Sequence, residues 1–230
     1  MQVVMAAAGK GSRFKDYTEV PKPFININGK PMWWLAIEQW LDYGIPTVLF
    51  HTDHERWYED PPFDVNIIWL DEYSQGAAHT AYLGLKMNNL IDGGDGVVFV
   101  ECDSNIHFDH SDWLQTASLY SGTFTTHSSS PNHSYCRVEG LKVLEIREKE
   151  VISQYANTGH YWWRTANEFM WTFEDAYENN RRTRGEFYMA PLYNDLIRSG
   201  KSVAIHMVDK WDCWGTPVEL EKFIESSTDY

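Results

Sequence analysis

The chain has 230 residues, 43% of them hydrophobic and 23% charged, which is typical of one globular domain with a substantial core. A net charge of -14 disfavours a nucleic-acid partner, and no stretch approaches the roughly 18 apolar residues that a membrane span needs. Three cysteines without metal-ligand spacing suit a reducing compartment. The N-terminus has no secretory pattern, so we expect a cytoplasmic protein.

A short apolar run at residues 3–8 predicts a buried strand, and a loop rich in glycine and basic residues follows it. The loop holds Gly9, Gly11 and Arg13, and Lys22 lies further on between two prolines. Glycine lets the backbone turn sharply and bring its N–H groups near an anion, while the prolines restrict the backbone on both sides of the lysine. This stretch therefore predicts a phosphate-binding loop.

The rest of the chain alternates between helical and strand patterns. Predicted helices span residues 32–43, 77–90, 165–180 and 188–198, and a last one begins at Pro217. Predicted strands span residues 46–51, 65–70, 96–101, 158–163 and 202–208, with short β-like runs across 122–146. Strands and helices that alternate over short connections predict an α/β fold: a Rossmann-like domain with a mixed, mainly parallel central sheet flanked by helices. Ligands of such sheets bind at the carboxyl ends of the strands.

The first loop reads A-A-G-x-G-x-R, followed by P-K-P and G-K-P-M, and it resembles the signature of the sugar-phosphate nucleotidyltransferases. The resemblance extends over nearly the whole chain and implies a GT-A-like fold. It also implies that an acceptor phosphate attacks a nucleoside triphosphate with Mg²⁺ as cofactor. No linker-like composition divides the chain, so we expect a single nucleotidyltransferase domain over residues 1–230, with a nucleotide-binding half at 1–120 and an acceptor-binding half at 121–230.

The resemblance implies roles for the residues of the first half. Arg13 and Lys22 would be catalytic: the guanidinium can hold the leaving pyrophosphate, and the lysine can contact the α-phosphate and the acceptor phosphate. The segment Ser74 to Thr80 is similar to the family's base-reading segment, in which Gln75 can both donate and accept hydrogen bonds. The predicted nucleotide-binding residues are Ala8, Gly9, Gly11, Ser12, Gln75 and Gly76.

Three short motifs of the second half are similar to acceptor-binding motifs of the family. Lys149 lies in E-K-E, which is similar to E-K-P, and it would contact the acceptor phosphate. Asn157 and Gly159 lie in N-T-G, which would touch the sugar ring. Glu186 lies in G-E-F-Y and would reach sugar hydroxyls. Each motif is short, and their order along the chain is what supports the resemblance.

Asp103 follows an apolar strand at its carboxyl end, where the family holds its catalytic Mg²⁺. The second predicted metal ligand is Asp212. The family commonly has D-x-G-T-P in this region, and aligning it on residues 215–217 places Cys213 where its aspartate belongs. A one-residue shift on a strand turns the side chain to the opposite face. The second metal ligand could therefore be Asp212 or Asp209, or the site could lack a second aspartate.

The function that these motifs favour is Mg²⁺-dependent transfer of a nucleotidyl group to a sugar 1-phosphate, which forms a nucleotide-sugar and releases pyrophosphate. One alternative is a cytidylyltransferase for a phosphorylated alcohol, amine or amino acid. Another is a catalytically silent nucleotide-sugar-binding module, for which Cys213 is the support. Phe14 replaces the third glycine of the dinucleotide fingerprint and disfavours NAD-dependent chemistry. The sequence leaves open which base and which acceptor the chain uses and whether it forms a homo-oligomer.

Overall fold

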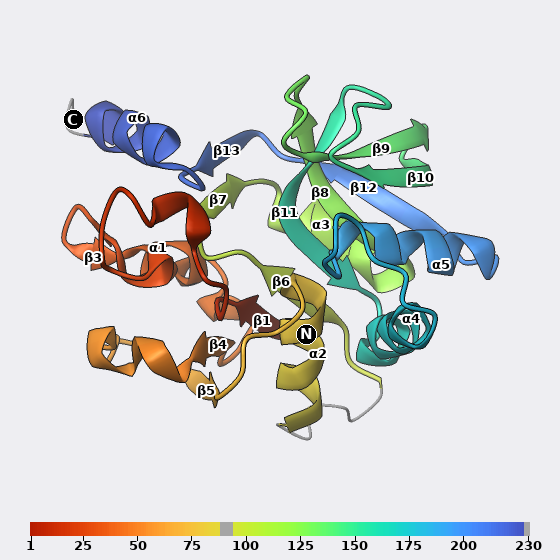
Figure 1. The fold of residues 1–230 in the computed structure, drawn as a ribbon. Coiled ribbons are helices and arrows are strands. Elements are labelled where there is room, and N and C mark those ends of the chain that lie inside the picture. Colours follow the sequence, from red (N-terminus) through yellow and green to blue (C-terminus); the bar gives the residue numbers. More distant parts are fainter. Residues whose placement is uncertain (88–93, 228–230) are drawn as a thin grey trace.

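A nine-stranded sheet runs through the molecule in the order β5-β4-β1-β6-β11-β8-β12-β10-β9 (Figure 1). The computed structural model describes residues 1–87 and 94–227. Its strands are β1 (Gln2–Ala6), β4 (Thr47–His51), β5 (Asn66–Leu70), β6 (Val97–Val100), β8 (Ser121–His127), β9 (Ser134–Glu139), β10 (Lys142–Glu148), β11 (Tyr155–Trp163) and β12 (Val203–Met207). Pairing directions show that β10 and β11 run against the other strands. The prediction of a mixed, mainly parallel sheet is confirmed.

Helices cover both faces of the sheet, and each face has its own hydrophobic core. Buried tryptophans dominate one core, including Trp33 and Trp113, whereas aromatic residues such as Phe99 and Phe169 fill the other. The helices are α1 (Met32–Glu38), α2 (Ala77–Met87), α3 (His110–Leu119), α4 (Ala166–Glu178), α5 (Tyr193–Arg198) and α6 (Pro217–Ser227). Among the described helices, none is long and apolar enough to cross a membrane.

Several predicted helices differ in extent from the observed ones. The helix predicted over 32–43 stops at Glu38 and resumes as a 3-10 turn, Leu41–Tyr43. The one predicted over 188–198 begins as a 3-10 turn, Ala190–Leu192, with a proline in its first turn. The last three residues of the helix predicted over 77–90 lie outside the described residues.

Two short strands away from the main sheet matter for the site. Strands β7 (Ser104–His107) and β13 (Lys210–Cys213) pair in antiparallel fashion, with Cys213 opposite Ser104. Figure 1 shows this pair joining the right-hand part of the molecule to the red and orange N-terminal part, where α6 also lies. The pairing holds the segment after β12 beside the residues that follow β6. A further small hairpin consists of β2 (Asn26–Ile27) and β3 (Lys30–Pro31).

Candidate active site

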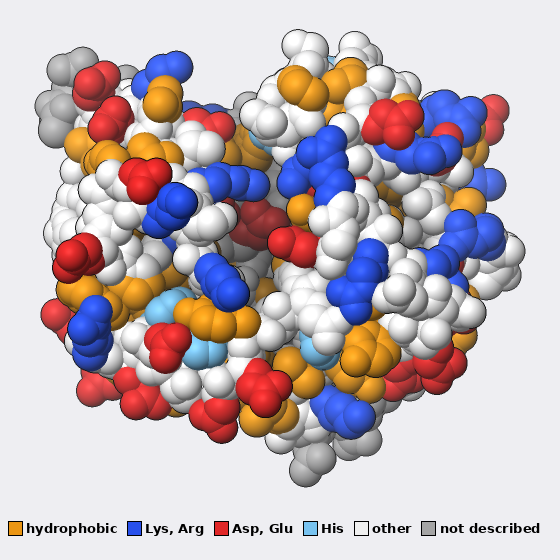
Figure 2. Space-filling model, viewed as in Figure 1, with side chains coloured by type: hydrophobic (Ala, Val, Ile, Leu, Met, Phe, Trp, Pro, Cys, Tyr) orange, Lys and Arg blue, Asp and Glu red, His pale blue; other side chains and the backbone are white. Residues whose placement is uncertain are grey.

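The loop after β1 and the residues after β6 leave the sheet at the same edge, because the two strands are parallel neighbours with Val4 beside Phe99. The first segment carries Arg13 and Lys22, and the second carries Asp103. Figure 2 shows the molecule hollowed between its two parts, with Lys and Arg side chains on both rims and acidic side chains further in. The parallel pairing therefore brings the predicted basic loop to the predicted metal-binding carboxylate.

Two adjoining cavities of about 480 and 500 Å³ form one cleft, because Arg13, Asp103, Lys149 and Gly159 line both of them. Motifs from both halves of the chain therefore meet in this cleft. The predicted site residues that line it are Gly9, Gly11, Ser12, Arg13, Lys22, Asp103, Lys149, Asn157, Gly159 and Glu186. Ala8, Gln75, Gly76 and Asp212 are not among its lining residues.

Lys22 and Asp103 form an ion pair at the floor of the cleft, where their side chains are only 18% and 8% exposed. Burial by itself would lower the pKa of Lys22, but the neighbouring Asp103 carboxylate raises it well above its usual range. Burial would raise the pKa of Asp103, whereas Lys22 holds it below its usual value. Both groups are therefore charged at neutral pH, and the ion pair holds the Lys22 ammonium at the floor of the cleft.

Arg13 lies at the mouth of the cleft on a 3-10 turn, Ser12–Phe14. Gly11 precedes the turn in the left-handed conformation, at a φ of 59°, and buried Phe14 anchors its end. The guanidinium is exposed and lines both cavities. A fixed backbone with a solvated guanidinium suits a residue that meets an incoming triphosphate.

Lys149 enters the cleft from the opposite side, just after β10. Its backbone is in the left-handed region, at a φ of 57°, and its N–H donates to the His133 carbonyl over 3.0 Å. The ammonium donates to the Tyr188 hydroxyl over 3.0 Å and lies 4.9 Å from the centre of that ring. The turn and the aromatic ring together direct this cation across the cleft from Arg13.

Asn157 is buried in the wall of the cleft that the second half of the chain forms. Its side-chain nitrogen donates to Ser134 over 2.7 Å, and its oxygen accepts from Thr123 over 3.2 Å and from the Cys136 thiol over 3.0 Å. These bonds tie β11 to β8 and β9. The side chain therefore supports the wall of the cleft, and its predicted contact with a sugar stays a prediction.

The predicted base-reading segment reaches the cleft at Ala77, whereas Gln75 and Gly76 lie beside the lining. The Gln75 side-chain oxygen accepts a hydrogen bond from Arg182, and the Gln75 N–H donates to His79 over 3.1 Å. Gly76 has a φ of 123°, and a Cβ there would lie 2.6 Å from the Phe187 carbonyl oxygen. Glycine is thus required here by a close approach of two backbone segments. Contact of this turn with a base stays a prediction.

Asp212, the predicted second metal ligand, and its neighbour Cys213 lie on β13 and face opposite ways. The carboxylate of Asp212 accepts from Lys210 over 2.9 Å and lies 3.1 Å from the His107 ring nitrogen. Cys213 lines the cleft instead, and burial raises the pKa of its thiol to about 12. Strand alternation explains the reversal. The structure therefore does not bring Asp212 to Asp103, and Asp209 does not line the cleft either.

Two carboxyl groups that were not among the predicted site residues lie in the cleft. Glu101 lines both cavities, and Glu148 lines the one of about 500 Å³. Burial, followed by the nearby Asp103 carboxylate, raises the pKa of Glu101 well above its usual range. Burial also raises the pKa of Glu148, to about 7. The spacing of Glu101 two residues before Asp103, which puts both on one side of the chain, is the sequence signal that could have identified it.

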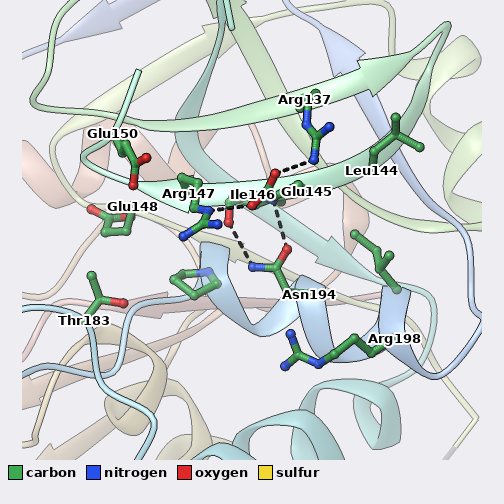
Figure 3. Close-up of a pocket in the computed structure, with 12 residues that line it drawn as sticks. Arg137, Leu144, Glu145, Ile146, Arg147, Glu148, Glu150, Thr183, Asn194 and Arg198 are labelled. Atoms are coloured by element: carbon green, nitrogen blue, oxygen red, sulfur yellow. Dashed lines mark hydrogen bonds and ion pairs between the residues drawn. The ribbon is translucent and has the colours of Figure 1, made fainter. Parts of the chain in front are cut away.

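A further cavity of about 520 Å³ lies between β10 and α5, outside the cleft (Figure 3). Three of its charged side chains are paired with one another: Glu145 receives hydrogen bonds from Arg137 and Arg147. Asn194 points at β10 and exchanges two hydrogen bonds with the Ile146 backbone, at 2.9 and 3.0 Å. These contacts fasten α5 to the sheet, and none of the predicted site residues lines this cavity.

Residues 3–124 match the family model of the MobA-like NTP transferase domain. The UTP–glucose-1-phosphate uridylyltransferase AglF of Haloferax volcanii is 25% identical over 227 residues, which cover 92% of this chain and 89% of the relative. The nucleoside-diphosphate-sugar pyrophosphorylase of Vibrio cholerae superposes with a TM-score of 0.82 at 21% identity, over 97% of this chain and 100% of that one. A UDP-glucose pyrophosphorylase solved with UDP-glucose gives 0.81 at 16% identity, over 99% and 98%.

A basic strand-end loop beside a buried carboxylate, in one cleft, can bind and neutralise a triphosphate, and these similarities agree with that use. The matched family model covers more than half of the chain. This chain belongs to the family of MobA-like NTP transferase domains and is a nucleotidyltransferase.

Proposed function

We propose that the chain transfers a nucleotidyl group from a nucleoside triphosphate to a sugar 1-phosphate, releasing pyrophosphate and forming a nucleotide-sugar. The supporting observation is the single cleft in which Arg13 and Lys22 face Lys149 of the other half. In this proposal residues 1–120 hold the nucleotide and residues 121–230 hold the acceptor. The uridylyltransferase relative favours UTP as the first donor to test.

The reaction makes one bond and breaks one bond at the α-phosphorus. An oxygen of the acceptor phosphate attacks that phosphorus, and the bond to the β-phosphate oxygen breaks, so pyrophosphate leaves with the electron pair. Lys149 would hold the acceptor phosphate, and Lys22 would neutralise the charge that gathers at the α-phosphate. Arg13 would bind the leaving pyrophosphate at the mouth of the cleft.

The remaining predicted residues would position the two substrates. The backbone of the loop Ala8, Gly9, Gly11 and Ser12 would surround the triphosphate, and Gln75 with Gly76 would meet the base. Asn157, Gly159 and Glu186 would form the side of the cleft that receives the sugar.

A divalent cation, Mg²⁺ in this proposal, fits the floor of the cleft. Asp103 supplies a carboxylate there, and the Gly215 backbone packs closely against it, since a Cβ at that position would lie 2.7 Å from an Asp103 oxygen. Mg²⁺ is usually held by one or two carboxylates together with substrate phosphates and waters. When bound, the cation would neutralise phosphate charge, and Asp103 would hold it there.

The test is pyrophosphate release with Mg²⁺ across the common nucleoside triphosphates, each crossed with sugar 1-phosphates and with phosphorylated alcohols, amines and amino acids. The proposal predicts release that requires both substrates and a sugar 1-phosphate as the best acceptor. A preference for CTP with a phosphorylated alcohol, amine or amino acid would identify the cytidylyltransferase alternative. Nucleotide-sugar binding without release from any pair would refute the proposal and identify a silent binding module.

A further inference from the structure

The proposed cation site has one carboxylate from Asp103 and lacks a second one from β13. Asp212 faces Lys210 and His107, and the residue that faces the cleft is Cys213. Its thiol is protonated at neutral pH, and a neutral thiol is a poor ligand for a hard cation such as Mg²⁺. In the part of the chain that the structure describes, no group of three or more His, Cys, Asp and Glu side chains is arranged to hold a metal.

Glu101 lies where a second carboxylate is missing. It belongs to the same strand end as Asp103 and lines both cavities with it. The two carboxyl groups are near enough to share a hydrogen bond.

The surroundings of Glu101 hold its carboxyl group in place. Gly159 of β11 packs against it so closely that a Cβ at that position would lie 2.6 Å from a Glu101 oxygen. Gly215 packs in the same way against Asp103, at 2.7 Å. Each carboxyl group thus has backbone on one side and the open cleft on the other.

We infer that Glu101 and Asp103 together supply the carboxylate ligands of the divalent cation, in place of any acidic residue of segment 209–213. This inference rests on the proposed function for the cation's role in turnover, but it concerns binding. Lys22 balances the charge of the Asp103 carboxylate, and the Glu101 carboxyl group lines the cleft beside this ion pair, where its oxygens can supply further ligands. Two carboxylates, with phosphate and water for the remaining positions, match the usual Mg²⁺ site of a nucleotide-dependent enzyme.

The test is Mn²⁺ binding to the whole chain in the absence of substrates. Electron paramagnetic resonance measures the concentration of free Mn²⁺, from which the affinity follows. Glu101→Gln keeps the shape of the side chain and removes its charge, and we expect Mn²⁺ affinity to fall at least about tenfold. Asp212→Asn is the matched control on β13 and should stay within about twofold, because its partners are Lys210 and His107. Glu101→Asp, which restores the charge, should recover part of the affinity.

Three outcomes would overturn the inference: a wild-type chain that does not bind Mn²⁺, a Glu101→Gln variant that binds it as the wild type does, or a loss in Asp212→Asn. If Glu101 instead met the acceptor, Mn²⁺ affinity would be unchanged while the acceptor KM rose. Pyrophosphate release is measured separately. If the chain releases pyrophosphate but its Mn²⁺ affinity does not depend on Glu101, only this inference is contradicted. If Mn²⁺ affinity depends on Glu101 but no pyrophosphate is released, only the proposed function is contradicted.

Discussion

Two lysine–carboxylate pairs in this chain show how surroundings decide what an ion pair does. Lys22 and Asp103 meet on the floor of the cleft, where both side chains are largely removed from water. Lys30 and Glu38 meet at the surface over 2.7 Å, with side chains 46% and 34% exposed. Water screens the surface pair, so it contributes little to stability, whereas a buried charge that loses its partner is costly.

Replacing Lys22 by alanine should remove both a phosphate contact and the partner of Asp103. We expect kcat/KM for nucleotidyl transfer to fall by about 10²–10³-fold or more, because a fixed charge at the reacting phosphate is lost. The measurement is steady-state pyrophosphate release. Lys30→Ala makes the same change at the surface pair and should leave the rate within about twofold. Equal rates for Lys22→Ala and the wild type would contradict the assigned role.

The raised pKa of Glu148 predicts that the stability of the fold depends on pH, and it also fixes the sign of that dependence. Its carboxyl group has an ordinary pKa of 4.5 and a folded pKa of about 7, because burial disfavours the charged form. Between these values the folded chain holds a proton that the unfolded chain has released. The stabilisation from this group is therefore complete below about pH 4.5 and is lost as the pH rises toward 7.

Chemical unfolding from pH 4.5 to 7.5 measures this effect as the difference between the wild type and Glu148→Gln, which has no titrating group at that position. The free energy of unfolding of the wild type should fall relative to the variant by about 1 kcal/mol, a discounted value because the carboxyl is partly exposed. A difference that is flat across this range, or that rises, would show that Glu148 ionises normally.

At the scale of elements, the turn between β5 and α2 is fixed by contact with a distant segment. The Phe187 N–H donates to the Gln75 carbonyl over 2.9 Å, and the Ala78 N–H donates to the Phe187 carbonyl over 3.1 Å. Gly76 lies between these two bonds and leaves no room for a side chain. The first-half turn and the Gly185–Met189 segment are therefore held together as one edge of the molecule.

Gly76→Ala should destabilise the fold by about 2 kcal/mol or more, since the new Cβ meets the Phe187 backbone and the positive φ strains any other residue. Urea unfolding is the measurement. Gly94→Ala is the matched control, because no atom lies within 4 Å of its Cβ position, and it should change stability by less than about 0.5 kcal/mol. A similar small effect at both positions would show that the Gly76 contact does not form.

Elements with a strong apolar pattern were predictable from the sequence, whereas those defined by distant partners were not. The β1 and β6 strands are nearly all buried, and their continuous apolar runs identify them. Helix α3 was missed because only Trp113 and Ala117 are buried along it, which leaves a weak pattern. Strands β7 and β13 pair across about a hundred residues, and no local signal specifies such a partner.

The candidate site divides in the same way. The basic loop and Asp103 were predictable because each is a local motif at a strand end. Glu101 was predictable only in part: its place two residues before Asp103 is a local signal, but its contact with Gly159 depends on the distant strand β11. Asp212 was chosen as a ligand by nearness in sequence, but the alternation of β13 turns it toward Lys210.

At the scale of the whole molecule, the two halves of the chain form the two walls of the cleft. The parallel part of the sheet delivers the basic loop and the acidic strand end, while β10, β11 and the segment after α4 deliver the opposite wall. Strand pairing β7–β13 closes the arrangement by linking the C-terminal segment back to the residues after β6. A reaction that joins two phosphorylated substrates needs two such walls that face one another.

Transfer of the α-phosphate itself is the most direct measurement of the central claim. UTP labelled at the α-phosphorus is incubated with the chain, Mg²⁺ and glucose 1-phosphate, and the products are separated. The account predicts that the label moves into a nucleotide-sugar while the pyrophosphate stays unlabelled. Label that is recovered only in UMP, or that stays in UTP for every acceptor and labelled triphosphate tried, would contradict the account.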